Sequence, residues 1–334
     1  MEKNCANFGL EYCDLPTMLL NVSILLRVLT VNIDNNYKKG TRYLHVYVYV
    51  FSMAWFVFWR CTITGERVAA MIVLSLGITS EIGNLKLIYM CLYINKIKTI
   101  AEDFLACDSQ VIRGSRFHVN LIKSLRTVKK RAIIYWMIPC LEPMFVSPNY
   151  EIADLMRIGG ITFVCYVPAN VTAFLIVIAG YTESQMLALS EEMIQIWPEA
   201  IKEAEKEMEV TKIDERNPRD RKLINKYVMR RLKEIIVRHA LVINLFQRVE
   251  GVAMDCFTGQ RVMDASVVFE QAVYDCQWEN FDKANMKMVH IMVQNSQKTM
   301  TLSAGGMAML SFSCLMTITR GIYSAYTALR SAVK

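Results

Sequence analysis

One uncharged segment limits most strongly how this chain can fold. Ile158–Tyr181 is a run of 24 residues without Asp, Glu, Lys or Arg. A helix needs about 20 predominantly apolar residues to cross the hydrocarbon core of a bilayer. Pro168 lies inside the run, and a membrane helix tolerates proline when neighbouring groups satisfy the freed carbonyl. The segment therefore predicts a transmembrane helix.

Other apolar segments predict further spans. Thr299–Thr319 holds 21 uncharged residues between Lys298 and Arg320. Aromatic residues from Tyr43 to Trp59 suit the two membrane interfaces. The expected spans are residues 43–60, 68–94, 132–147, 158–181 and 299–325, with 239–257 as a weaker candidate. The last is weaker because it contains Arg248, Glu250 and Asp255.

Composition agrees with a membrane protein of one domain. The chain of 334 residues is 54% hydrophobic, and the apolar residues gather in blocks. No linker rich in Gly, Ser or Pro divides it, so residues 1–334 are expected to form one domain. The net charge of +7 is explained by basic residues that flank the apolar blocks, and no nucleic-acid groove is indicated. The expected fold class is all-α, a polytopic transmembrane helical bundle.

The distribution of Lys and Arg predicts the orientation. Residues 95–131 carry nine of them and residues 182–238 carry twelve, whereas Arg67 and Arg157 stand alone in the intervening loops. Basic loops stay in the cytoplasm. The N-terminus is therefore expected to be cytoplasmic. Residues 183–238 and 261–298 are expected to form long helices that extend into the cytoplasm and pack on one another.

Counting spans raises a conflict. If residues 239–257 cross, the chain is outside before the last span. Lys283, Lys287 and Lys298 favour a cytoplasmic start for that span. Either a span is missing or residues 239–257 do not cross.

Enzymatic motifs are absent from the sequence. It has no HExxH, no Walker loop, no Gly-rich dinucleotide turn and no GxSxG. The ten cysteines form no CxxC pair, and the four histidines are isolated. We expect no enzyme activity, no cofactor and no metal site.

The C-terminal third resembles the insect odorant receptor family. Tyr274-Asp-Cys-Gln-Trp278, Asn295-Ser-Gln-Lys298 and Leu302-Ser-Ala-Gly305 match the family's patterns in order and spacing. Ile322–Leu329 resembles the family's closing segment, and Leu232–His239 resembles the helix that enters the membrane after a His. The resemblance implies a subunit of seven helices with a cytoplasmic N-terminus. It also implies that such subunits assemble as a tetramer, usually with a shared co-receptor, into an odorant-gated cation channel.

One departure from the family pattern matters. Asp255–Gly259 runs directly into Arg261–Ser266, so the outer end of the fifth helix and most of the sixth are missing. A lost return span would resolve the conflict in the count. It would also remove one wall of a ligand pocket.

The resemblance places two sites. The last helix lines the pore in the family, and the expected pore residues are Ile322, Ala325, Ala328 and Leu329. Odorants bind in the outer half of the bundle. The expected pocket residues are Met71, Leu74, Ser75, Met137, Cys140, Met144, Thr162 and Tyr166. For any single pocket residue, ordinary helix packing is the simpler explanation, and a packed helix end is the alternative for the pore residues.

The first functional hypothesis is therefore an odorant receptor subunit in the plasma membrane of a sensory neuron dendrite. It would detect small volatile apolar molecules in olfactory signal transduction, with the co-receptor and the lipid bilayer as partners. A shortened or degenerate receptor without channel activity is the main alternative. A G-protein-coupled chemosensory receptor would need an outside N-terminus, which the basic loops oppose. A transporter would need two related halves, which the sequence lacks.

Overall fold

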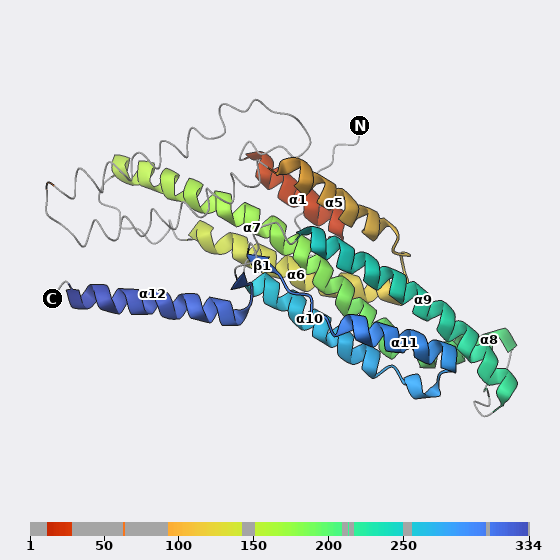
Figure 1. The fold of residues 1–334 in the computed structure, drawn as a ribbon. Coiled ribbons are helices and arrows are strands. Elements are labelled where there is room, and N and C mark those ends of the chain that lie inside the picture. Colours follow the sequence, from red (N-terminus) through yellow and green to blue (C-terminus); the bar gives the residue numbers. More distant parts are fainter. Residues whose placement is uncertain are drawn as a thin grey trace, which may run out of the picture. The chain divides into compact units, whose positions relative to one another are not determined.

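The computed structural model describes residues 12–28, 63, 93–141, 151–208, 213, 217–249, 256–304 and 308–332. The expected span 43–60 lies outside these residues, as does nearly all of 68–94. The long helices are α1 (Leu15–Val28), α5 (Ile94–Ser109), α6 (Arg116–Leu141), α7 (Glu151–Ile194), α8 (Ile196–Met208), α9 (Pro218–Val249), α10 (Cys256–Tyr274), α11 (Lys283–Ser296) and α12 (Phe312–Ala332) (Figure 1). Apart from one short hairpin and a 3-10 turn, Trp278–Asn280, the described elements are α-helices, which confirms the all-α class.

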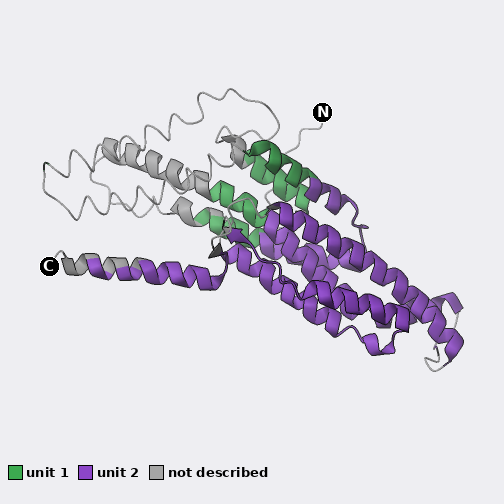
Figure 2. Cartoon of the chain, viewed as in Figure 1, with its two compact units in different colours: residues 1–102, 129–177 green, residues 103–128, 178–334 purple. Residues whose placement is uncertain are grey.

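The chain divides into two compact units (Figure 2). The first comprises residues 1–102 and 129–177, and the second comprises residues 103–128 and 178–334. Helices α5, α6 and α7 contribute residues to both.

In the first unit, α1 begins with a side-chain cap. The Asp14 carboxylate accepts hydrogen bonds from the backbone N–H of Thr17, at 3.1 Å, and from its hydroxyl, at 2.7 Å. Such a cap satisfies donors that the first helical turn leaves free. The Lys129 ammonium donates to the carbonyl oxygen of Tyr12 at 2.5 Å. The apolar face of α1 is buried, so α1 belongs to the packed structure of this unit.

The second unit is a bundle whose buried residues recur at helical spacing. On α9, Ile224, Val228, Leu232 and Ile235 are buried, as expected for one face of an amphipathic helix. Helix α9 packs against α8 and α11, and α10 packs against α11. Phe269, Val273 and Cys276 are completely buried. The expectation that the helices of segments 183–238 and 261–298 pack on one another agrees with these contacts.

Helix α7 is long and apolar. Within the described part, one helical stretch, Ala169–Ile194, is long and apolar enough to cross a membrane, and 89% of its most apolar window is buried in the protein. It overlaps the expected span 158–181. Helix α7 runs on for 13 residues beyond Tyr181.

The last helix starts later than the sequence predicted. We expected a helix from Thr299, but α12 begins at Phe312. Before it, β1 (Ser303–Ala304) pairs with β2 (Ala308–Met309) as an antiparallel hairpin. The sequence contains Gly305 and Gly306, and each glycine costs a helix about 1 kcal/mol relative to alanine. Residues 303–304 and 308–309 are therefore strands where the sequence predicted part of a span.

Helices α9 and α10 are joined by a short connection. Helix α9 ends at Val249 and α10 begins at Cys256, so only residues 250–255 lie between them. The weaker candidate span 239–257 therefore includes the end of one helix and the start of the next. Arg248, in the last turn of α9, forms an ion pair with Asp103.

Candidate functional site

The expected odorant-pocket residues lie mostly outside the described side chains. Met71, Leu74, Ser75 and Met144 are outside the described residues. The backbones of Cys140 on α6 and of Thr162 and Tyr166 on α7 are helical, but their side chains are not described. Met137 on α6 is 47% exposed. The pocket therefore stays a prediction.

The four expected pore residues all fall on α12. Ala328 is exposed, and the other three side chains are not described. Large apolar side chains of α12 are exposed along its length: Phe312, Leu315, Met316, Ile318 and Tyr323. A continuous exposed apolar surface marks contact with lipid or protein. The exposed side of α12 is therefore suited to contact with lipid or with another protein.

The base of α12 rests on the first turn of α10 (Figure 1). A Cβ atom at Gly259 would lie 2.2 Å from the carbonyl oxygen of Leu310 and 2.9 Å from its Cβ. Only glycine allows this approach, because Leu310 presents backbone rather than a movable side-chain end. Gly259 and Leu310 are both buried.

Further contacts join the same two segments. The backbone N–H of Phe312 donates to the side-chain oxygen of Gln260 at 3.1 Å. The rings of Phe257 and Phe312 lie 5.7 Å apart, centroid to centroid. Near the start of the hairpin, the N–H of Met300 donates to the hydroxyl of Ser266 at 3.2 Å. Helix α10 therefore contacts the chain on both sides of the hairpin that precedes α12.

An ion pair connects the first turns of α10 to α7. Arg261 donates from Nε and Nη2 to the same oxygen of Glu183, at 3.1 and 2.6 Å. The Glu183 side chain is only 3% exposed, whereas that of Arg261 is 39% exposed. A buried carboxylate needs such a partner, because leaving a charge unpaired in the interior is costly. We call Glu183, residues 256–261 and residues 310–312 the junction.

Buried polar residues surround Glu183 on α7. The Tyr181 hydroxyl donates to the Asp108 carboxylate at 3.0 Å and accepts from the Gln185 amide at 2.6 Å. Next to Asp108, burial raises the pKa of the Cys107 thiol. This stretch of α7 thus contacts α5 through Tyr181 and α10 through Glu183.

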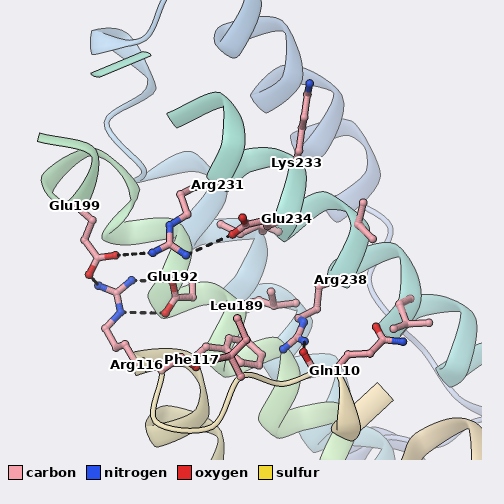
Figure 3. Close-up of a pocket in the computed structure, with 15 residues that line it drawn as sticks. Gln110, Arg116, Phe117, Leu189, Glu192, Glu199, Arg231, Lys233, Glu234 and Arg238 are labelled. Atoms are coloured by element: carbon pink, nitrogen blue, oxygen red, sulfur yellow. Dashed lines mark hydrogen bonds and ion pairs between the residues drawn. The ribbon is translucent and has the colours of Figure 1, made fainter. Parts of the chain in front are cut away.

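A separate groove of about 840 Å³ lies among the α5–α6 connection, α7, α8 and α9 (Figure 3). Arg116 lies between Glu192, at 2.9 Å, and Glu199. Arg231 reaches Glu203 and Glu234, each at 3.4 Å.

Arg238 closes another part of the groove. It donates to the carbonyl oxygen of Gln110 at 3.2 Å, and its guanidinium lies 4.5 Å from the centre of the Phe117 ring. Pockets for small ligands are predominantly apolar with a few converging polar groups. Here the charged groups pair mainly with one another, so the arrangement holds helices together and does not suit an apolar odorant.

Sequence reasoning missed the junction. It treated Gly259 and Ser266 only as parts of a family pattern, and it did not consider Glu183. One signal was available: Glu183 is a single acid two residues after an uncharged run of 24 residues. A charge at that place needs a partner. The identity of the partner, Arg261, could not be read from spacing.

Comparisons with known proteins agree with this architecture. Residues 251–323 match the family model described as 7tm Odorant receptor. The structure is similar to that of the insect olfactory receptor OR5 from Machilis hrabei, with a TM-score of 0.55 and 11% identity over 94% of this chain and 98% of that chain. No curated protein matches the sequence. The predicted resemblance to the insect odorant receptor family is thus confirmed by sequence over residues 251–323, and the structural match shows a similar fold over nearly the whole chain.

Proposed function

We propose that the chain is one subunit of an odorant-gated cation channel in the plasma membrane, assembled as a tetramer with the family's co-receptor. The match over residues 251–323 carries this proposal. That segment contains α10, α11, the hairpin and more than half of α12. The family uses the last helix to line its pore, and the match covers the first part of that helix, up to residue 323. Of the four expected pore residues it includes Ile322, whereas Ala325, Ala328 and Leu329 lie beyond it.

The surface of α12 supports a pore in an assembly of subunits. Its exposed apolar residues are unsuited to water, and a helix at the centre of a tetramer would place them against lipid and neighbouring subunits. Ile322, Ala325, Ala328 and Leu329 would face the ion path. Small and apolar side chains at a constriction can gate ions by excluding water.

We propose that α9 and α10 form a hairpin that stays on the cytoplasmic side. Six residues join them, and Arg248 in the last turn of α9 pairs with Asp103 in a segment predicted to be cytoplasmic. With this hairpin inside, four spans precede it and α12 crosses as the fifth. The conflict in the span count then disappears.

This topology can be tested by inserting an extended glycosylation acceptor tag at either of two places. A tag within residues 250–255 should stay unmodified, whereas the same tag within residues 147–150 should be modified, since that loop is expected outside. Modification of the first tag would mean that α9 crosses the membrane.

For the ligand, we propose small volatile apolar molecules bound in the outer half of the bundle. The candidate residues remain Met71, Leu74, Ser75, Met137, Cys140, Met144, Thr162 and Tyr166. Dispersion and shape would dominate binding there, and methionine suits this because its thioether side chain adapts to different shapes. Since the family's fifth and sixth helices lack their outer parts in this chain, the pocket would have fewer walls.

Co-expression with an insect co-receptor tests the proposal. Odorant-evoked cation current that is absent with the co-receptor alone would support it. The short α9–α10 connection favours one alternative, a degenerate receptor that reaches the surface but does not conduct. Confirmed surface expression with no current across a broad odorant panel would select that alternative.

A further inference from the structure

We propose that the ion pair between Glu183 and Arg261 is a positioning element, which fixes the base of α12 through the first turns of α10. The inference rests on the proposed function for its meaning in a channel. Its structural content, that α7 holds the α12 base through α10, can be tested without any current.

Helix α10 contacts both α7 and the segment from which α12 starts. Gly259 lies against the Leu310 carbonyl, Gln260 accepts from the Phe312 N–H, and Phe257 packs on the Phe312 ring. Arg261 is the next residue after Gln260, and it pairs with Glu183 on α7. Contacts to α7 and to α12 therefore come from within five consecutive residues of one helix.

The backbones of α10 and of the segment before α12 are in direct contact, because a Cβ at Gly259 would come within 2.2 Å of the Leu310 oxygen. No flexible side chain separates them. A displacement of the first turn of α10 would therefore move Leu310, and with it the residue from which α12 starts.

Glu183 has an arginine, Arg261, as its partner. Glu183 is nearly fully buried, and both N–H donors of Arg261 converge on one of its oxygens. Arginine can donate these two hydrogen bonds from its planar guanidinium, which lysine lacks. The pair therefore fixes both the distance and the orientation of α10 relative to α7 at this level.

Glu203 on α8 offers a matched control in the same unit. It pairs with Arg230, at 2.6 Å, and with Arg231, at 3.4 Å, both on α9. The Glu203 side chain is 31% exposed, whereas that of Glu183 is only 3% exposed, and exposed pairs contribute less. Glu203→Gln therefore makes the same change of chemistry in a more exposed set of ion pairs between α8 and α9, outside the junction.

The experiment compares hydrogen–deuterium exchange of the full chain, in detergent or nanodiscs, for the unchanged protein, Glu183→Gln, Arg261→Gln, Arg261→Lys and Glu203→Gln. The peptide over residues 299–312 contains the amides of Met300, Leu310 and Phe312, which bond to Ser266, Leu302 and Gln260. Glu183→Gln and Arg261→Gln should each accelerate its exchange by roughly ten- to a hundredfold, less than for a fully buried pair that loses one member, because the Arg261 side chain is 39% exposed. Arg261→Lys should fall between, and Glu203→Gln should leave this peptide unchanged.

Two outcomes would overturn the inference. One is unchanged exchange over residues 299–312 in both charge-removing variants. The other is an equal increase in the α8 peptides, which would mean general destabilisation of the unit rather than a local effect. The double variant Glu183→Gln with Arg261→Gln should exchange no faster than the worse single variant, because both remove the same interaction.

Recordings of odorant-evoked current from cells that also express the co-receptor test the link to channel function. At equal surface expression, Glu183→Gln should reduce the maximal odorant-evoked current by roughly tenfold, and Glu203→Gln should not change it. If the protein without substitutions gave no current, this would count against the proposed function. The hydrogen–deuterium exchange result would still decide whether the ion pair positions the base of α12. Normal current in Glu183→Gln, together with accelerated exchange, would refute the link to gating.

Discussion

The close approach of Gly259 to Leu310 gives the sharpest stability prediction. In Gly259→Ala the new methyl would stand 2.2 Å from a carbonyl oxygen, 2.9 Å from Leu310 Cβ and 3.1 Å from its carbonyl carbon. The backbone of α10 or of the hairpin must then move by about 1 Å, since an ordinary contact is above 3 Å. Overpacking of this kind costs about 1–3 kcal/mol, and the better helix propensity of alanine offsets at most about 1 kcal/mol of it.

The control is Gly321→Ala on α12, where a Cβ meets nothing within 4 Å. That variant should be neutral or more stable, because only the propensity difference acts. Thermal unfolding of the detergent-solubilised chain, followed by size-exclusion chromatography after heating, compares the two. The propensity gain is common to both variants, so the overpacking cost of about 1–3 kcal/mol, at roughly 2–4 °C per kcal/mol, should place the midpoint of Gly259→Ala roughly 2–12 °C below that of Gly321→Ala. Equal midpoints for Gly259→Ala and Gly321→Ala would refute the packing described at the junction.

Three further predictions concern the helices outside the junction. His239 stacks on Phe269, and burial lowers its pKa to about 4, whereas a free histidine titrates near 6.5. As the pH falls, the unfolded chain therefore binds the proton before the folded chain does. The free energy of unfolding should fall by about 3 kcal/mol between pH 6.5 and 4. Melting across this range should show the loss in the unchanged protein and a smaller one in His239→Phe; parallel curves would contradict it. The Asn225 side-chain oxygen accepts from the Asp282 N–H at 2.8 Å and from the Asn285 amide at 3.2 Å. Asn225→Ala should therefore lower the free energy of unfolding by about 2–4 kcal/mol, which would appear as a lower melting midpoint. An unchanged midpoint would argue against this network. Gln277 has a left-handed backbone, φ 57°, so Gln277→Gly should raise the midpoint by relieving about 1 kcal/mol of strain, and a lower midpoint would show that its side chain contributes more.

The helical class and the packing of the C-terminal helices were predictable because their causes are local. Apolar residues at helical spacing, such as Ile224, Val228 and Leu232, determine which face of α9 is buried whatever the neighbouring element is. The start of α12 was not predictable in the same way. An uncharged run fits a helix by hydropathy alone, and the preference for a hairpin depends on Gly305 and Gly306 together with support from Ser266 and Gly259 on another helix.

The junction was beyond sequence reasoning for a similar reason. The contact between Glu183 and Arg261 joins residues 78 positions apart, and several other arginines could have met that carboxylate. The pore and pocket residues came from resemblance to a family. Their spacing on α12 or in the spans is compatible with ordinary packing, so only measurements on the assembled protein can assign their roles.

Cysteine accessibility on α12 shows which of its residues face the ion path. Ile322→Cys and Thr327→Cys, which lie on different faces of α12, would each be co-expressed with the co-receptor, and a charged thiol reagent would be applied during odorant-evoked current. The account predicts that the current through Ile322→Cys is progressively blocked, while Thr327→Cys and the unchanged chain keep theirs. Full resistance of Ile322→Cys, with current and surface expression intact, would mean that this face of α12 does not line the ion path.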